Sequence, residues 1–341
     1  MLAQNAPAIN EVLEGKGPFS FSDYIARVKP RLDLAFKAQL LSCLRNIPMN
    51  DTAYLVESLE AGKKIRGCLT CMIAEALGSP VQAAIPRAVA MELIHTATLI
   101  HDDYVDQHMT RRNRSAPWTL EGARRAVLIG DTLVATTMKS MSDLGREECQ
   151  VTSHAVALLS KGALYETLDP SALIREMESD RFRDNLYERI IYLKTGILFG
   201  TACQLGAITA KATRELGMIS FRYGVKIGEA YQIADDMADI EHSLKTRSIH
   251  PEEMASLTPA ILYFLKEVPP FILPLLKGNG WLSLSEEMMK VLQLALGRMS
   301  DAVRSRLEST VSEMGERFPK NSYFGLVKQA PWDLLRIFTE S

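Results

Sequence analysis

The segment from Ala88 to Tyr104 decides the fold class, and it reads Ala-Val-Ala-Met-Glu-Leu-Ile-His-Thr-Ala-Thr-Leu-Ile-His-Asp-Asp-Tyr. It is apolar almost all round, as expected of a helix in the centre of a large bundle. The segment from Gly224 to Asp239 repeats the feature as Gly-Val-Lys-Ile-Gly-Glu-Ala-Tyr-Gln-Ile-Ala-Asp-Asp-Met-Ala-Asp. Both apolar helices therefore carry adjacent aspartates, which need an explanation.

Most of the remaining chain has the same helical character. Stretches rich in Ala, Leu, Met, Glu, Lys and Arg repeat apolar residues at three- and four-residue steps, and strict alternation with β-branched residues is nearly absent. Pro and Gly mark several breaks. The sequence predicts an all-α fold with helices over 21–46, 51–59, 64–77, 82–108, 118–144, 148–164, 171–205, 209–240, 251–276, 284–318 and 322–338.

Length and composition favour a soluble, folded chain. The 341 residues are 47% hydrophobic and 23% charged, which is ample for a large core. No Gly/Ser-rich linker or low-complexity tract divides the middle, so we predict a single domain over 1–341. The most apolar window, 259–276, contains Lys266, Glu267, Pro269 and Pro270, and it is therefore not expected to span a membrane.

Charge and cysteine usage narrow the setting. The formal net charge of −2 predicts no general attraction to nucleic acid, so a polyanionic substrate would need clustered cations or metal ions. Five scattered cysteines and a start without signal-peptide character predict a reduced, cytoplasmic setting. Cys68 and Cys71 lie in a predicted helix without a second Cys pair, and we interpret them as core residues.

The pattern Asp-Asp-x-x-Asp occurs twice, at Asp102, Asp103 and Asp106 and at Asp235, Asp236 and Asp239. On a helix the first and third aspartates lie one turn apart on one face. Like charges on an apolar helix repel and are costly to desolvate, so cations are needed to neutralise them. Oxygen ligands favour Mg²⁺, and two facing clusters would clamp a diphosphate. One copy alone could equally be a solvated helix end.

Basic residues accompany the aspartates. Arg111 and Arg112 follow the first cluster, Lys194 lies within 192–196, and an earlier helix begins with Lys63, Lys64 and Arg66. Arg and Lys are the usual protein groups for binding phosphate. Each group alone would be ordinary surface charge, but together with the aspartates they favour a diphosphate site.

These residues resemble the trans-isoprenyl diphosphate synthases, or polyprenyl synthetases, in order from about residue 29 to 259. The resemblance rests on Gly62-Lys63-Lys64-Ile65-Arg66, the segment 92–112, Gly130-Asp131-x-Leu133, Lys194-Thr195 and Gly228-x-x-Tyr231-Gln232-x-x-Asp235-Asp236-x-x-Asp239. It implies one large helical bundle of the isoprenoid synthase type, with a central active-site cavity, in a homodimer.

The resemblance also implies residue roles. An allylic prenyl diphosphate would be held through Mg²⁺ by Asp102, Asp106 and Asp235 and contacted by Arg111, Lys194 and Gln232, while Asp103, Asp236 and Asp239 support the metal. Isopentenyl diphosphate would lie in a metal-free pocket of Lys63, Arg66, His95 and Arg112. His101, beside the aspartates, is interpreted either as structural or as a residue that supports the metal ligands from behind.

The implied reaction needs no side-chain nucleophile. Metal ions and cations would stabilise the charge on the departing diphosphate, and the isopentenyl double bond would attack the allylic carbocation that remains. The resulting cation would then lose a proton to the released diphosphate, which restores a double bond. Lys194 and Thr195 would help to stabilise that cation, with the Thr195 carbonyl and hydroxyl facing it. The chain shows no Ser/His/Asp or Cys/His arrangement that favours covalent catalysis.

Product length in this family depends on side-chain size just before the first aspartates. Ala97 and Thr98 are both small, so nothing there resembles the aromatic floor of farnesyl-type enzymes, and we predict products of C20 or longer. A deeper stripe, which is either a floor or ordinary core, comprises Met91, Ile94, Val134, Met138 and Met141.

Two stretches depart from the family pattern. The usual Gly-Lys loop after the second cluster is absent, which leaves Lys245 or Arg247 to supply its charge, and 160–166 lacks the expected acidic residue and Gln. The altered loop leaves open a non-catalytic partner subunit. A class I terpene cyclase would also use Mg²⁺ and a diphosphate but no isopentenyl site. The basic residues and two intact clusters favour the synthase.

Overall fold

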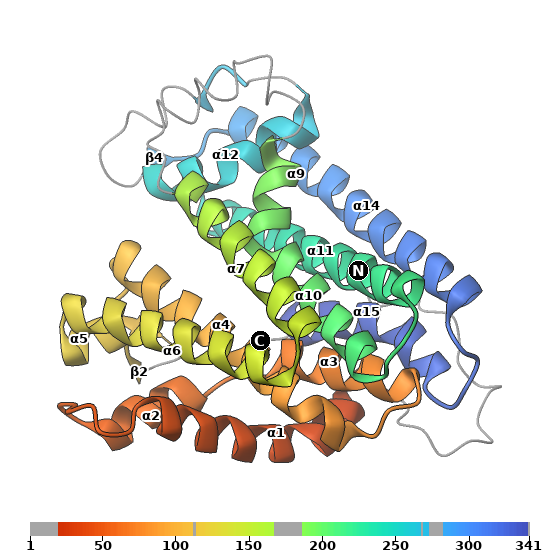
Figure 1. The fold of residues 1–341 in the computed structure, drawn as a ribbon. Helices are drawn as coiled ribbons and strands as arrows, with labels where there is room; N and C mark the ends of the chain where they lie inside the picture. Colours follow the sequence, from red (N-terminus) through yellow and green to blue (C-terminus); the bar gives the residue numbers. More distant parts are fainter. Residues whose placement is uncertain (1–19, 112–113, 167–185, 267–268, 273–281, 340–341) are drawn as a thin grey trace.

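The computed structural model describes residues 20–111, 114–166, 186–266, 269–272 and 282–339. Its described part is almost wholly helical, and the predicted all-α fold is confirmed (Figure 1). The helices are α1 (Phe21–Cys43), α2 (Thr52–Glu60), α3 (Ile65–Ala76), α4 (Val81–Val105), α5 (Pro117–Glu121), α6 (Ala123–Leu144), α7 (Arg146–Glu166), α9 (Leu186–Ile191), η1 (Tyr192–Gly196), α10 (Ile197–Thr209), α11 (Arg214–Thr246), α12 (Pro251–Leu265), α14 (Glu286–Arg317) and α15 (Phe324–Thr339).

Two short antiparallel ladders join neighbouring helices. Strand β1 (Thr110–Arg111) pairs with β2 (Arg114–Ser115), directly after the helix that carries the first aspartate cluster. Strand β3 (Ser248–Ile249) pairs with β4 (Leu282–Ser283), directly after α11. Each aspartate-bearing helix is thus followed by a short ladder that fixes the direction of the chain.

Local backbone chemistry explains where the helix boundaries differ from those predicted. The predicted helix over 118–144 is broken at Gly122, whose φ of +84° lies in the left-handed region that glycine adopts readily. The predicted helix over 209–240 begins only at Arg214, where Thr213 accepts a hydrogen bond from Leu216 N, and it continues to Thr246. The helix predicted over 251–276 ends at Leu265. Residues 171–185 of another predicted helix lie outside the described residues.

The core is organised around α4, α10 and α11. Helix α4 packs against α3, α6 and α10, while α11 lies between α10 and α14 (Figure 1). The largest hydrophobic cluster joins α1, α3, α4 and α15, and a second one joins α9, α11, α12 and α14. Cys68 and Cys71 are buried free thiols in the first, and burial raises the pKa of Cys71 to about 12, so their interpretation as core residues is confirmed.

Helices α10 and α11 approach each other closely because glycines line both sides of their contact. A Cβ atom on Gly224 would lie 2.3 Å from the carbonyl oxygen of Phe199, and one on Gly228 would lie 3.0 Å from Gly196 Cα. Only residues without a side chain fit between backbones at such distances. This crossing brings η1 against the part of α11 that leads into the second aspartate cluster.

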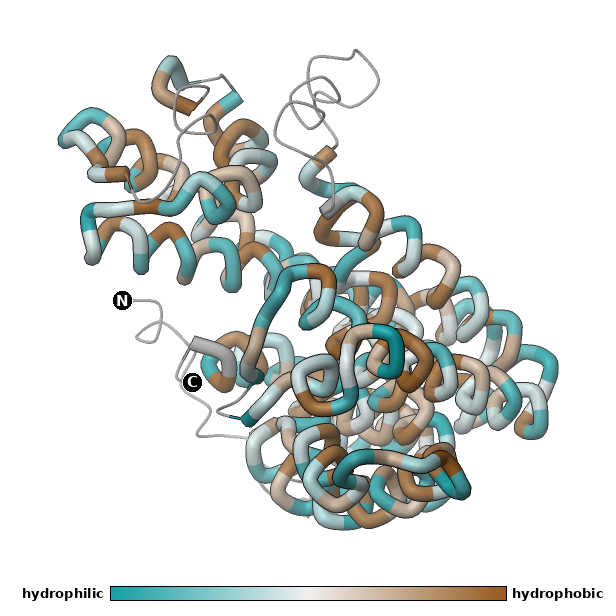
Figure 2. Tube along the Cα trace, turned by 90° about the vertical axis from the view of Figure 1, so that its left-hand side faces the viewer, coloured by the Kyte–Doolittle hydropathy of each residue, from teal (hydrophilic) through white to brown (hydrophobic). Residues whose placement is uncertain are grey.

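Two helical segments in the described part are long and apolar enough to cross a membrane, Val81–Val105 and Leu186–Thr209. Burial inside the bundle covers 61% and 78% of their most apolar windows, as in the core helices of a folded domain. Figure 2 shows hydrophobic and hydrophilic residues interleaved along most of the described chain. A single domain and a cytoplasmic location stay predictions.

Candidate functional site

The first aspartate cluster lies at the C-terminal end of α4. Asp103 is 1% exposed, and Arg111 of β1 donates from Nε to its Oδ1 at 2.7 Å. Asp102 is partly exposed and Asp106 is exposed. Asp103 therefore anchors the end of the helix, while Asp102 and Asp106 are the members of the cluster that solvent can reach. Arg111, predicted to contact a diphosphate, holds Asp103 here.

His101 ties the same helix end to α6. Its Nε2 lies 3.1 Å from the Val127 carbonyl oxygen and 3.5 Å from Asp131 Oδ1. The ring packs on Gly130, where a Cβ atom would lie 2.3 Å from Nε2. His101 thus makes contacts within the protein fold, and the Gly130-Asp131 motif provides the space and a partner for it.

The second aspartate cluster lies on α11, and a chain of hydrogen bonds runs through it. Thr195 Oγ1 donates to Gln232 Oε1 at 2.7 Å, and Gln232 Nε2 donates to Asp236 Oδ1 at 3.0 Å. The hydroxyl of Tyr187 donates to the other oxygen of Asp236 at 2.5 Å. The structure thus brings together Thr195, Gln232 and Asp236, which the sequence placed in one site.

Burial shapes the charges of this cluster. It raises the pKa of Asp236 to about 6, although the hydrogen bonds from Tyr187 and Gln232 oppose that shift. Burial also raises the pKa of Asp235, which Lys194 opposes, and the pKa of Asp239, to which the charge of Asp235 adds. The ionised cluster is therefore electrostatically costly, and a bound cation would relieve that cost.

Lys194 and Thr195 lie on η1, a single π-helical turn between α9 and α10. Such turns are rare and often occur at functional sites, because the widened turn redirects side chains. Lys194 is exposed and its charge acts on Asp235, Asp236 and Asp239, whereas Thr195 is 4% exposed. One turn thus supplies a cation to solvent and a hydroxyl to the buried Gln232.

Of the residues expected to bind isopentenyl diphosphate, Lys63 lies just before α3, Arg66 lies on α3 and His95 lies on α4. Lys63 donates from Nζ to the carbonyl oxygen of Ile337 at 2.7 Å, and the guanidinium of Arg66 lies over the ring of Phe199 at 4.6 Å. His95 is partly exposed on α4. Arg112 lies outside the described residues. The pocket that these residues are expected to form stays a prediction.

No group of three or more His, Cys, Asp or Glu side chains converges on one point within the described ranges, so they hold no closed metal cage. Magnesium commonly uses one or two carboxylates and completes its coordination with water and substrate phosphates. Asp102, Asp106 and Asp235 are partly or fully exposed oxygen ligands, and Asp235 has an unfavourable environment for its charge. The residues present therefore fit a divalent cation bound together with a diphosphate.

Sequence reasoning missed an ion-pair group behind the second cluster. Arg306 of α14 donates to Glu188 of α9 and lies 3.6 Å from Glu229 of α11, while Tyr263 of α12 donates to Glu188 at 2.5 Å. Glu229, Gln232 and Asp236 share one face of α11 by their spacing of three and four residues. The residues of this group are far apart in the chain, so no local sequence pattern could have indicated them.

We expect the stability of the fold to depend on pH through Glu229. Its side chain is 15% exposed, and burial raises its pKa from 4.5 to about 7 despite the charge of Arg306. Because the folded state favours the protonated form, its contribution to stability is complete below pH 4.5 and is lost as the pH rises through about 7. The free energy of unfolding of the unaltered chain should fall with rising pH by about 3 kcal/mol more than that of Glu229→Gln. Urea unfolding of both proteins between pH 4.5 and 8 measures it, and identical slopes would contradict it.

The residues expected to set product length lie inside the bundle. Ala97 is fully buried, and Thr98 donates its hydroxyl to the carbonyl oxygen of His95. Met91 and Ile94 form a separate apolar cluster with Leu198, Ala202 and Leu205, against which Met138 packs. Val134 packs on the main core instead, and Met141 is fully buried. These side chains are thus packed in the apolar interior and split between clusters, and their role as a floor for the product stays a prediction.

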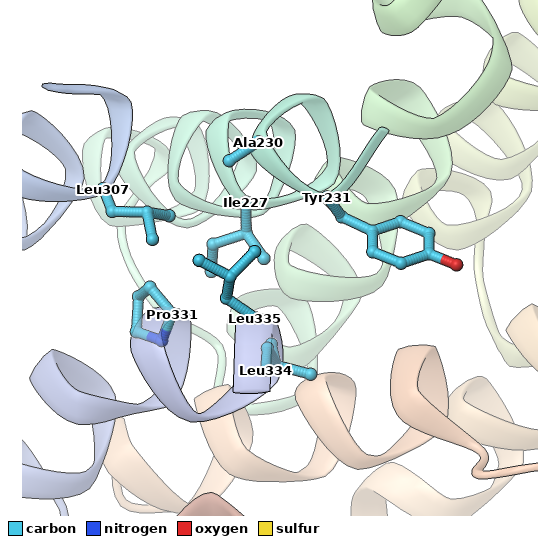
Figure 3. A pocket seen from close by; sticks show the side chains of 7 residues that line it. All are labelled: Ile227, Ala230, Tyr231, Leu307, Pro331, Leu334 and Leu335. Carbon is cyan, nitrogen blue, oxygen red and sulfur yellow. The ribbon is translucent and has the colours of Figure 1, made fainter. Parts of the chain in front are cut away.

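A small cavity lies behind α11, on its side toward α14 and α15 (Figure 3). Its lining is almost wholly apolar and comprises Ile227, Ala230, Tyr231, Leu307, Pro331, Leu334 and Leu335. The volume is about 10 Å³, close to the smallest space that holds one water molecule. It is a packing gap, far too small for a substrate.

The two cations that follow the second aspartate cluster, Lys245 and Arg247, have different surroundings. Arg247, one of two cations expected to replace the missing loop charge, has a φ of +54° and ends α11. Its guanidinium pairs with Glu286 at the start of α14 at 2.7 Å. Lys245 is exposed on the last turn of α11. Of the two, Lys245 is the one for which the described structure shows no ion pair.

The family model described as polyprenyl synthetase matches residues 51–248, more than half of the chain. The matched part contains both aspartate clusters, η1 and the basic start of α3. The chain is 33% identical to a geranylfarnesyl diphosphate synthase of Methanosarcina mazei over 178 residues, which cover 52% of this chain and 58% of that protein. It is also 33% identical to an octaprenyl diphosphate synthase of Escherichia coli, over 56% of this chain and 57% of that protein. The matches thus span under two thirds of these relatives.

The fold comparison extends further than the sequence comparison. A polyprenyl synthase from Caulobacter crescentus, in complex with calcium and isoprenyl diphosphate, superposes with a TM-score of 0.66. The match covers 94% of this chain and 98% of that one, at 22% sequence identity. At this identity the likeness establishes the shared fold.

Proposed function

We propose that this chain, which belongs to the polyprenyl synthetase family, is a Mg²⁺-dependent trans-prenyltransferase that joins an allylic diphosphate to isopentenyl diphosphate. The single observation that carries the proposal is the junction of η1 with α11. There the Lys194 charge faces three aspartates, and Thr195, Gln232 and Asp236 are hydrogen-bonded in sequence. This arrangement suits a metal-bound diphosphate that leaves as an anion.

The metal-facing roles go to three of the cluster carboxylates that solvent can reach. Asp102 and Asp106 would bind divalent ions from α4 and Asp235 from α11, while Asp103, Asp236 and Asp239 support the two clusters. When bound, Mg²⁺ would neutralise the negative charge that develops on the departing diphosphate. The Caulobacter crescentus neighbour is in complex with calcium and isoprenyl diphosphate, which supports the proposal that this chain uses a divalent ion and a diphosphate substrate.

The protein groups would then orient the two substrates. Lys194 and Gln232 would contact the allylic diphosphate, and Arg111 would do so while keeping its bond to Asp103. Thr195 would direct its carbonyl and hydroxyl oxygens towards the allylic cation, although its hydroxyl is held by Gln232 here. Lys63, Arg66, His95 and Arg112 would hold isopentenyl diphosphate without metal, so that its double bond faces the allylic carbon.

We further propose products of C20 or longer. Ala97 and Thr98 leave little side-chain volume one turn before Asp102, and the next obstacles along α4 are Ile94 and Met91. The two relatives named above are themselves named for long prenyl products. The homodimer and the preferred primer stay predictions.

Product analysis tests the proposal directly. The purified chain is incubated with Mg²⁺, labelled isopentenyl diphosphate and, in turn, the C5, C10, C15 and C20 allylic diphosphates, and the products are sized. We expect elongated prenyl diphosphates of C20 or more. Release of diphosphate from a primer with formation of a cyclic hydrocarbon would instead establish a terpene cyclase, and no reaction with any primer would favour a partner subunit.

A further inference from the structure

The second aspartate cluster is held from behind by a side chain that the proposed reaction does not use. Tyr187 of α9 is 3% exposed, and its hydroxyl donates to Asp236 Oδ2, while Gln232 donates to Oδ1 of the same carboxylate. Donors on both oxygens fix the plane of a carboxylate, and bonds to an ionised acceptor are strong. Asp235 and Asp239 are exposed on the same helix, so Asp236 is the fixed member of the cluster.

The ring of Tyr187 has little freedom to move. It packs against Tyr263 with the ring centroids 5.5 Å apart and against Phe264 with the centroids 5.7 Å apart and the planes at 70°. Both rings belong to α12. The edge-on contact with Phe264 has a geometry that adds stability beyond burial alone. The hydroxyl of Tyr187 is therefore presented to Asp236 from a rigid support.

Helix α9 is in turn fixed by the residue next to Tyr187. Glu188 accepts hydrogen bonds from Tyr263 and Arg306, and Arg306 also lies beside Glu229 on α11. The short helix, only six residues long, is thus tied to α11, α12 and α14. On α11 this polar group ends at Glu229, about two helical turns before Asp235 and Asp236. Among the described hydrogen bonds, Tyr187 alone connects α9 to the aspartates.

We propose that Tyr187 is a positioning residue for the second aspartate cluster, acting through Asp236 to orient it towards a divalent metal ion and a diphosphate. The inference rests on the proposed function for its ligand class. Its physical basis is the rigid support of a bond that ends on a cluster carboxylate rather than on a backbone group. Outer partners of metal-binding carboxylates commonly change metal affinity when they are removed.

Two matched variants test the proposal, each removing one hydroxyl from one of two neighbouring rings. Tyr187→Phe removes the donor to Asp236, and Tyr263→Phe removes a donor to Glu188 that does not touch the cluster. Calorimetry of the full chain with Mg²⁺ and inorganic diphosphate is expected to show binding weakened about tenfold or more by Tyr187→Phe. The same titration of Tyr263→Phe is expected to match the unaltered chain, with circular dichroism confirming that both variants are folded.

A double-mutant cycle separates positioning from simple structural support. In an Asp236→Asn background, Tyr187→Phe is expected to cause no further loss of diphosphate binding, because the residue through which it acts is already changed. An equal loss in both backgrounds would overturn the proposal, as would unchanged binding by Tyr187→Phe alone. Binding of inorganic diphosphate requires no catalytic turnover. If the chain binds it with Mg²⁺ but transfers no prenyl group, only the proposed function is wrong. Absence of Mg²⁺-dependent diphosphate binding by the unaltered chain would overturn both.

Discussion

Replacing Asp235 with asparagine is expected to lower the rate of prenyl transfer by about 1,000-fold while leaving the chain folded. Asp235 is the exposed first member of the second cluster and faces the charge of Lys194. An amide has nearly the same size but no charge with which to hold a divalent ion against a diphosphate. The measurement is the initial rate of labelled isopentenyl diphosphate incorporation at saturating primer and Mg²⁺.

The same substitution should not destabilise the metal-free protein. Burial raises the pKa of Asp235, so the ionised carboxylate is less favourable in the folded chain than in the unfolded chain. The free energy of unfolding therefore falls as the pH rises and Asp235 ionises. Asparagine carries no charge and avoids this decrease. Urea unfolding at pH 8 should therefore show that Asp235→Asn is at least as stable as the unaltered chain. Asp143→Asn is the matched control, since Asp143 is exposed on α6 and pairs with Lys139. Activity of Asp235→Asn within tenfold of the control would show that Asp235 does not hold the metal.

The parts of the fold that periodicity controls were predictable. Helices α4 and α11 stand out because a buried helix must be apolar on most of its surface, and the aspartates stand out because they break that rule. The π-helical turn η1 was not predictable, since Tyr192–Gly196 differs from a regular helix only by hydrogen-bond pairing. Sequence patterns report which face is buried and are silent about such changes in pairing.

The candidate site shows the same division. The motif residues Thr195, Gln232 and Asp236 were expected together, and they are in contact. Tyr187, Glu188 and Arg306 were missed because the role of each depends on a hydrogen-bond partner on another helix. Arg111 was assigned to substrate, yet its bond to Asp103 is a contact within the protein that charge alone could not reveal. A sequence shows which groups are charged, whereas their partners depend on packing.

Replacing Gly224 with alanine is expected to destabilise the fold by about 3 kcal/mol or more. The added methyl group would lie 2.3 Å from Phe199 O and 2.8 Å from Gly200 Cα. These are backbone atoms of α10, so no side-chain rotation relieves the clash and the two helices must separate. Since η1 is continuous with α10, the separation would also stretch the Thr195–Gln232 hydrogen bond of 2.7 Å. Urea unfolding gives the stability, and prenyl transfer at a temperature where the variant is folded gives the effect on the site.

Gly217→Ala is the control for this substitution, because it makes the same change on the same helix. A Cβ atom at Gly217 meets nothing within 4 Å, and alanine is the better helix former by about 1 kcal/mol. The two variants should therefore shift stability in opposite directions, with activity lost only in Gly224→Ala. If Gly224→Ala were instead as stable as Gly217→Ala, α10 and α11 would not lie in backbone contact in solution. In that case an element other than η1 would hold the second aspartate cluster in place.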